Sequence, residues 1–234
     1  MTDSFRYVNP DWLSNLLYFD DFFFIFQVYA GKVERKQLQL VGVAAMFIAS
    51  KYEEMYAPEI GDFVYITDRA YTESQIREME MRILDTLGFD LGRPLPLHFL
   101  RRNSKAGNVD ALTHTMAKYI MELTLVEYKM AHWKPSLVAA SALALSLKVL
   151  DQDQKSLSQL WSPTLVHYTS YKLSEISDTV AKLATLVLTT SRAPENSKLL
   201  AVRKKYEDKK MSRISKTLEL TGESMEQLAA GNFL

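Results

Sequence analysis

The chain has 234 residues, 47% of them hydrophobic and 24% charged, which suits one large domain or two domains of about 100 residues each. Its 28 basic residues balance its 28 acidic residues, which argues against a broad nucleic-acid-binding surface, because such a surface needs a basic excess. The absence of cysteine excludes disulfides and thiolate zinc sites.

The predicted elements are all helical, because glycine and proline are few while Leu, Ala, Met and Lys are common. The most apolar window, at 22–30, is too short to span a bilayer, so we expect no membrane segment. The helix predicted at 36–55 is apolar nearly all round, which is typical of a helix buried on most sides. Pro58 ends this pattern, and a short helix is predicted at 58–66.

A further helix is predicted at 73–87, with a start and a stop signal in the sequence. Thr72 and Gln75 have the spacing of a capping box, and Gly88 is a typical residue just past a helix end. The predicted apolar face of this helix consists of Ile76, Met79, Ile83, Leu84 and Leu87.

Two prolines in RPLPLHFL (93–100) interrupt the helical pattern and predict a domain boundary. A second set of helices is predicted beyond it, at 97–105, 110–129, 135–151, 159–169 and 172–190. The residues after 194 are more polar, and we expect KYEDKKMSRIS (205–215) to be a solvated tail that packs loosely against the rest.

An internal repeat relates the two sets of helices. LVGVAAMFIASK (40–51) aligns with LVAASALALSLK (137–148), and YTESQIREMEMRIL (71–84) aligns with YKLSEISDTVAKLA (171–184). The alternative is that amphipathic helices simply resemble one another. We interpret the alignment as two copies of one helical module, each with a central helix that carries a stripe of small residues.

The two copies differ in where they place charge. Glu80 aligns with Val180, and Glu53 and Glu54 align with Leu150 and Asp151. A single charge such as Lys51 usually snorkels from a buried helix to solvent. Lys51 and Glu80 lie on two helices of the same module, however, and this favours a polar clamp on a partner's backbone within an apolar contact.

No catalytic constellation is visible in the sequence. The four histidines, His98, His114, His132 and His167, lack metal-ligand spacing, and we interpret them as surface or capping residues. The phosphate-binding loop, the dinucleotide-binding glycine pattern and the nucleophile elbow are all missing. We therefore expect a helical binding module that is not an enzyme and that has no metal and no cofactor.

The segment from QLVGVAAMFIASKYEEMYAPEIGDF to LGRPLPLHFLRR (39–102) resembles the cyclin box of mitotic B-type cyclins. The resemblance continues through HTMAKYIMELTLVEY (114–128), PSLVAASALALSLKVL (135–150) and VRKKYEDKKMSRIS (202–215). It implies an all-α fold of two tandem five-helix cyclin boxes. The implied domains are an N-terminal box at 1–92 that diverges over 1–34, a C-terminal box at 93–194 and a tail at 195–234.

The resemblance also implies a function and a site. In cyclins, the Lys of the ASKYEE motif and a Glu on the helix after YITD bind backbone around the C helix of a cyclin-dependent kinase and activate it allosterically. The matching residues here are Lys51 and Glu80. The apolar remainder of that surface matches Tyr52, Leu84, Phe89 and Leu91. The implied role is mitotic regulation in the nucleus and cytoplasm, without binding to nucleic acid or membrane.

The N-terminal segment departs from the family pattern. FRYVNPDWL (5–13) places Asn9 and Pro10 where aliphatic residues belong, and proline inside a helix costs about 3 kcal/mol or more. The first box is therefore expected to be incomplete at its N-terminal helices. Trp12, Arg35 and Gln39 match the groove that docks substrates or inhibitors with RxL-type motifs. The other apolar residues of that groove are missing or replaced, which argues against docking.

Two alternatives to a kinase activator remain open. A degenerate cyclin-like chain would bind a kinase weakly or without activating it, and the N-terminal departures favour this reading. A transcription factor built from paired cyclin folds would need a basic face, which the balanced charge opposes.

Overall fold

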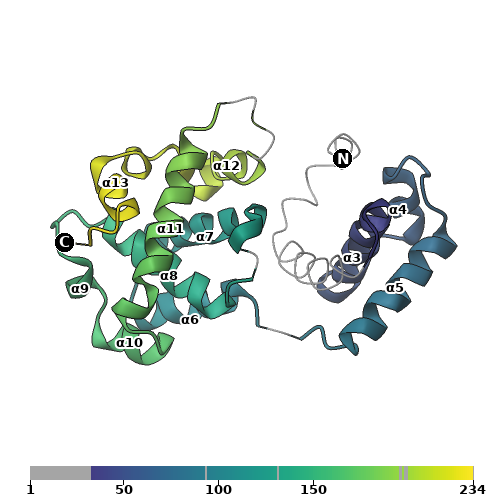
Figure 1. The fold of residues 1–234 in the computed structure, drawn as a ribbon, viewed down its shortest axis with the longest axis horizontal. Helices are drawn as coiled ribbons and strands as arrows, with labels where there is room; N and C mark the ends of the chain where they lie inside the picture. Colours follow the sequence, from purple (N-terminus) through teal and green to yellow (C-terminus); the bar gives the residue numbers. More distant parts are fainter. Residues whose placement is uncertain (1–32, 93, 131, 195–196, 198–199, 234) are drawn as a thin grey trace. The chain divides into compact units, whose positions relative to one another are not determined.

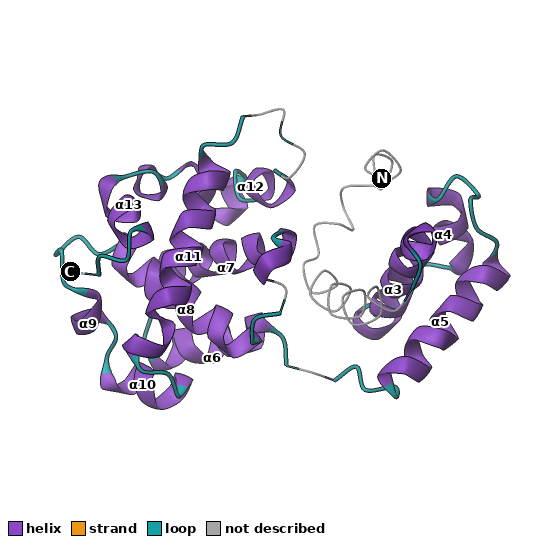
Figure 2. Cartoon of the chain, viewed as in Figure 1, coloured by secondary structure: helices purple, strands orange, loops and turns teal. Residues whose placement is uncertain are grey.

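The computed structural model describes residues 33–92, 94–130, 132–194, 197 and 200–233, and these residues are helices and loops without a strand (Figures 1 and 2). The chain divides into two compact units, Met1–Arg93 and Pro94–Leu234. Within the described residues, no helix combines the length and apolar character needed to cross a bilayer. The predicted N-terminal helices and Pro10 lie outside the described residues.

The described part of the first unit consists of one short 3₁₀ turn and three α-helices. They are η1 (Arg35–Gln37), α3 (Leu38–Glu53), α4 (Ile60–Ile66) and α5 (Glu73–Leu87). α3 packs against α5 along its small residues, and Gly42, Ala45 and Ala49 are buried. Phe47 of α3 meets Phe63 of α4 edge-on, with ring centroids 5.1 Å apart. The predicted central helix is thus confirmed as the core element of this unit.

The predicted boundaries of α5 are confirmed. Gln75 N–H donates to the Thr72 hydroxyl, and the Gln75 side chain accepts from Thr72 N–H at 2.9 Å, which forms the capping box. Gly88 ends the helix in the left-handed region, with φ of 61°. Of the predicted apolar face, Ile76, Met79 and Ile83 are buried, and Leu84 and Leu87 are half-buried.

We expect Thr72→Ala to lower the free energy of unfolding by about 1 kcal/mol, because the first turn of α5 loses its side-chain acceptor. Urea denaturation followed by circular dichroism would measure this change. Thr72→Ser keeps the hydroxyl and is the matched control. An equal loss in both variants would show that the capping hydrogen bond is not the cause.

The second unit begins with the helices of a repeated module. They are α6 (Pro96–Ala106), α7 (Ala111–Leu123), α8 (Pro135–Val149), α9 (Leu157–Leu160), α10 (Pro163–Thr169) and α11 (Leu173–Ser191). α8 lies in the middle and packs against α6, α7 and α11 (Figure 1). Ala139, Ala142 and Ser146 are fully buried along it, as the repeat predicts.

Two predicted helices of this unit are corrected. The helix predicted at 110–129 ends at Leu123 and continues as the 3₁₀ turns η2 (Thr124–Val126) and η3 (Tyr128–Met130), because Glu127 between them is extended. The helix predicted at 159–169 is two helices, α9 and α10. Ser162 caps α10 by accepting from Leu165 N–H, and Pro163 at the first position starts a new helix.

The burial pattern supports the repeat. Ile76 and Ile176 are both fully buried, and so are Ile83 and Leu183 at the next equivalent pair. The pair Glu80 and Val180 is also buried in both copies, so only the chemistry of that position differs. Structural equivalence therefore isolates Glu80 as a charge in a core position.

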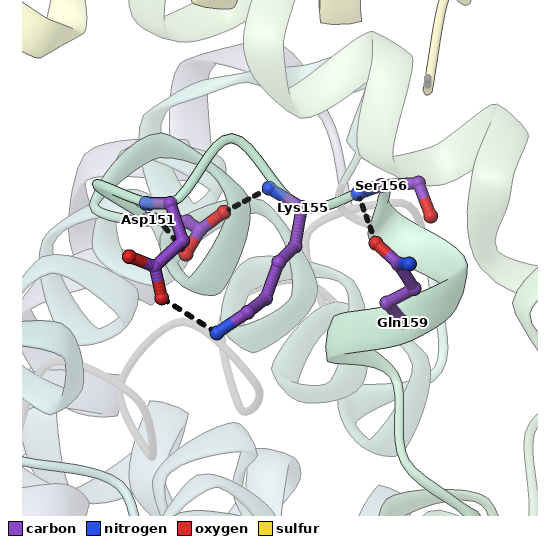
Figure 3. A network of polar contacts seen from close by, with 5 residues as sticks. Asp151, Lys155, Ser156 and Gln159 are labelled. Carbon is purple, nitrogen blue, oxygen red and sulfur yellow. Dashed lines mark hydrogen bonds and ion pairs between the residues drawn. The ribbon is translucent and has the colours of Figure 1, made fainter.

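The acid at the end of α8 has a structural role (Figure 3). The Asp151 carboxylate accepts from Asp153 N–H at 3.4 Å and from Lys155 N–H at 2.5 Å. Ser156 N–H then donates to Gln159 Oε1 at 2.9 Å, which is part of the capping box of α9. Asp151, the counterpart of Glu54, thus organises the turn between two helices.

The expectation of a solvated, loosely packed tail is wrong for the core-facing residues of this segment. It forms α12 (Ala201–Lys205), η4 (Lys209–Met211), η5 (Ile214–Lys216), η6 (Leu218–Leu220) and α13 (Glu223–Ala229). Tyr206 and Ile214 are fully buried in the core of the second unit, as are Met225 and Leu228. The segment contains many lysines, but most of its large apolar residues are buried, and Leu218 is the exposed exception among those that the structure describes.

A buried carboxylate joins this segment to α7. Glu122 accepts a hydrogen bond from the Tyr206 hydroxyl and pairs with Lys205 Nζ at 3.2 Å. Burial raises the pKa of Glu122, and this effect outweighs Lys205, Tyr206 and Lys118, which act in the opposite direction. The ionised form therefore carries a desolvation cost in the folded protein.

We expect the free energy of unfolding of the wild type, relative to Glu122→Gln, to rise as the pH falls through the raised pKa of Glu122. A raised folded-state pKa contributes stability that is complete below the unfolded value, 4.5, and is lost as the pH rises through the folded pKa. Urea denaturation at several pH values would measure the difference. The control Glu226→Gln removes an exposed carboxylate. A difference that does not change with pH would contradict the prediction.

Candidate functional site

Lys51 and Glu80, the two charges singled out in the sequence, meet in the structure. Lys51 Nζ donates to Glu80 Oε1, so the last turn of α3 is bonded to the middle of α5. The Lys51 side chain is 43% exposed and the Glu80 side chain only 10%. Lys51 Nζ also lies 4.2 Å from the centroid of the Phe47 ring. The pair is thus anchored on its protein side and open to solvent on the lysine side.

Local sequence explains how the pair is held. Lys51 is the basic residue of the last turn of α3, where the helix dipole favours a positive charge. Glu80 follows Met79 on α5 and shares the buried face with Ile76 and Ile83. Because this face packs on α3, the Glu80 carboxylate is directed towards the end of that helix, where Lys51 neutralises it.

The predicted apolar residues lie in the same unit as this pair. Tyr52 is 51% exposed and Phe89 is 61% exposed, whereas Leu84 and Leu91 are half-buried and pack against the α3–α5 core. The Tyr52 hydroxyl lies 3.8 Å from the place where a Cβ on Gly92 would stand, so it adjoins the segment after α5.

Phe89 has an unusual backbone as well as an exposed ring. Its φ of 57° follows that of Gly88, 61°, so two consecutive residues are left-handed. A bulky residue in this region costs free energy and persists where its surroundings hold it. The turn at the end of α5 therefore holds an aromatic side chain outside the core.

Sequence reasoning missed four exposed apolar side chains of the first unit. They are Met55, Tyr56, Tyr65 and Met81. Met81 follows Glu80 directly on α5, and a methionine at a position where the helix pattern calls for a polar residue was an available signal. Met55 and Tyr56 follow the charged end of α3. Adjoining exposed apolar groups mark an interaction surface, and Met55 and Tyr56 are neighbours in the chain.

The predicted docking groove is described only in part. Trp12 lies outside the described residues. Arg35 is exposed on η1, and Gln39 is half-buried on α3, where its Oε1 accepts a hydrogen bond from the Tyr71 hydroxyl at 3.2 Å. Gln39 thus has an internal partner, and docking at this place stays a prediction.

The histidines contribute to local structure. His98 Nδ1 accepts from Leu95 N–H at 3.3 Å at the start of α6, and His114 Nδ1 hydrogen-bonds Ser104 Oγ at 2.8 Å. Burial lowers the pKa of His114, and Lys118 and Arg101 lower it further. His132 and His167 are exposed. Among the described residues no group of three or more metal-binding side chains comes together.

Comparison with known proteins assigns a domain family to each of the two units. The family model of the cyclin N-terminal domain matches residues 18–92, and that of the cyclin C-terminal domain matches residues 94–220. The X-ray structure of a viral cyclin from herpesvirus saimiri has a TM-score of 0.57 and 18% identity. It covers 76% of this chain and 85% of the viral chain, and it supports the fold alone.

Curated relatives are similar at the level of sequence. G2/mitotic-specific cyclin-B of Patella vulgata is 55% identical over 196 residues, which are 84% of this chain and 46% of the relative. G2/mitotic-specific cyclin-B of Spisula solidissima is 55% identical over 200 residues, 86% of this chain and 44% of the relative. The chain therefore spans about half the length of the curated relatives it matches. With both domain models matched in order, the chain belongs to the cyclin family.

Proposed function

We propose that this chain binds a cyclin-dependent protein kinase and activates it allosterically in G2 and mitosis, as a regulatory subunit and not as an enzyme. The names of the relatives, G2/mitotic-specific cyclin-B, support the mitotic assignment. The two matched cyclin domains support the role of a kinase regulator.

The observation that carries the proposal is the Lys51–Glu80 pair within an apolar, exposed surface. An ammonium group has three donors and a carboxylate has two oxygens, so a single bond between them leaves groups for a partner. The end of a helix offers backbone N–H and C=O groups without intrahelical partners. Tyr52 and Phe89 would exclude water from such hydrogen bonds, as hot-spot surroundings do.

The proposed mechanism is a shift in the conformational equilibrium of the kinase, because a regulatory subunit supplies no catalytic group to the reaction. A kinase needs its C-helix glutamate paired with the lysine that positions ATP, and its activation loop ordered. Binding on the Lys51–Glu80 surface would favour the conformation in which that helix is turned inwards. The gain in activity is limited by the difference in affinity for the two conformations.

The test is to capture a purified mitotic cyclin-dependent kinase with the whole chain and to assay histone phosphorylation by the complex. Stable binding together with a large rise in phosphorylation is the expected result. Binding without a rise in activity would support the degenerate alternative. A folded, helical chain that does not bind the kinase would remove the proposal.

Two finer assignments belong to the same proposal. Substrates or inhibitors with RxL-type motifs would dock near Arg35 and Gln39, and a labelled RxL peptide titrated against the kinase complex would test this. We propose a location in the nucleus and cytoplasm, which microscopy of the tagged chain in dividing cells would examine.

A further inference from the structure

A pocket in the second unit has no part in the proposed kinase contact. It has a volume of about 380 Å³ and lies between α6 and α10, with a contribution from α8. We call it the α6–α10 pocket and define it by Phe99, Arg102, Asn103, Ser136, Tyr168 and Tyr171. All of these residues belong to the second unit, so the pocket does not depend on the placement of the first.

Asn103 is the unusual residue of this pocket. It is only 2% exposed, its side-chain amide makes no hydrogen bond with another described residue, and the amide is not among the side-chain atoms cut off from solvent without a partner. Its main-chain carbonyl is used normally and accepts from Gly107 N–H at 2.9 Å. Because Asn103 lines the pocket, its amide is reached through the pocket and is available to a bound molecule.

Two of the neighbouring hydroxyls already bond to each other. Ser136 Oγ and the Tyr171 hydroxyl share a hydrogen bond of 2.9 Å, and the Tyr171 carbonyl accepts from Trp161 Nε1 at 3.1 Å. These bonds hold this part of the pocket wall in place. Asn103 and the adjacent Arg102 remain available to hydrogen-bond a bound molecule.

The charge around the pocket is positive. The Arg102 guanidinium lies 5.6 Å from the centroid of the Tyr168 ring. A second hollow of about 650 Å³ shares Arg102 and Tyr168 with the pocket and adds Arg101 and Lys105. Among the described residues that line the two hollows there is no Asp or Glu. Arg102 therefore has no acidic partner among these lining residues and lies beside the Asn103 amide.

We infer that the α6–α10 pocket binds an acidic, unfolded segment of a partner protein. One Asp or Glu side chain enters between Arg102 and Asn103, where the guanidinium and the amide N–H groups donate to its carboxylate. Phe99 and Tyr168 enclose the aliphatic stem of that side chain. A further acidic residue lies over Lys105 in the adjoining hollow, so the ligand is a peptide and not a single small acid.

The experiment uses the whole chain and a fluorescein-labelled octapeptide of alternating glutamate and glycine, measured by fluorescence anisotropy. The same peptide with glutamine for glutamate is the uncharged probe. We expect binding of the glutamate peptide alone. Arg102→Gln and Asn103→Leu should each weaken it roughly tenfold or more, because each removes a hydrogen bond to a charged group.

Lys209→Gln is the matched control for charge, because Lys209 is exposed in the second unit and lines neither hollow. It should leave the affinity unchanged. Asn103→Asp is a second variant that keeps the volume of the side chain and repels a carboxylate. Circular dichroism would verify that each variant is folded. If Asn103→Leu does not fold, the affinity of Asn103→Asp provides the test of Asn103.

Three results would overturn the inference. One is the failure of the folded wild-type chain to bind the glutamate peptide. The second is an affinity that follows net charge alone, with Lys209→Gln as damaging as Arg102→Gln and with Asn103 variants unchanged. The third is binding restricted to a phosphoserine version of the peptide. None of these results bears on kinase binding, which uses the first unit.

Discussion

Replacing Lys51 and Glu80 together by alanine should weaken kinase binding at least about thirtyfold while the helical content of the chain stays nearly unchanged. A buried, charge-assisted hydrogen bond at an interface contributes roughly 2 kcal/mol or more. The Glu80 side chain is largely buried already, so its carboxylate is held for a partner by Lys51 and does not have to be ordered on binding.

The same substitution should cost the isolated chain less than it costs binding. The Lys51 side chain is 43% exposed and the Glu80 side chain 10%, and removing both partners leaves no unpaired charge in the core. A larger effect on binding than on stability is therefore the signature of an interface pair.

Affinity would be measured by surface plasmon resonance with the immobilised kinase, and helicity by circular dichroism. The matched control is Lys182→Ala with Asp178→Ala, which removes an exposed pair of 2.6 Å from α11, the equivalent of α5. The control should bind like the wild type. Wild-type affinity in the Lys51 and Glu80 double variant would remove this surface as the interface.

Val180→Glu should instead harm folding, lowering the free energy of unfolding by on the order of 3–5 kcal/mol. Val180 is fully buried in the core of the second unit, at the position equivalent to Glu80. A carboxylate there has no lysine like Lys51 to neutralise it, because the aligned Lys148 donates to the Lys155 carbonyl at 2.7 Å. Domains are typically stable by only about 5–15 kcal/mol, so the variant would be mostly unfolded or partly collapsed.

Urea denaturation and the yield of soluble protein would measure this loss. Thr185→Glu places the same charge on the exposed side of α11 and should change the free energy of unfolding by about 0.5 kcal/mol or less. A Val180→Glu variant as stable as Thr185→Glu would mean that the two copies of the module are wrongly aligned.

The elements that depend on neighbouring residues were predictable from the sequence. The capping box of Thr72 and Gln75, the stop at Gly88 and the small-residue stripes of α3 and α8 all follow from short-range rules of helix geometry. The repeat was predictable for a related reason, since equivalent core positions select residues of similar size. The charge at Glu80 was recognised because its counterpart is apolar.

Contacts between distant residues were decided only by the tertiary structure. Lys51 and Glu80 are 29 positions apart, and Glu122 and Tyr206 are 84 apart, so their pairing depends on how α3 meets α5 and how the C-terminal segment folds onto α7. The polar composition of that segment hid its buried residues. In the sequence nothing distinguishes Asn103 from other polar helix residues, and only the packing of α10 against α6 places it in a pocket. The sequence by itself determined most of the helices and the family. Long-range packing decided which polar groups meet and which lack a partner, because pairing over such separations is set by the shape of the core and not by local preference.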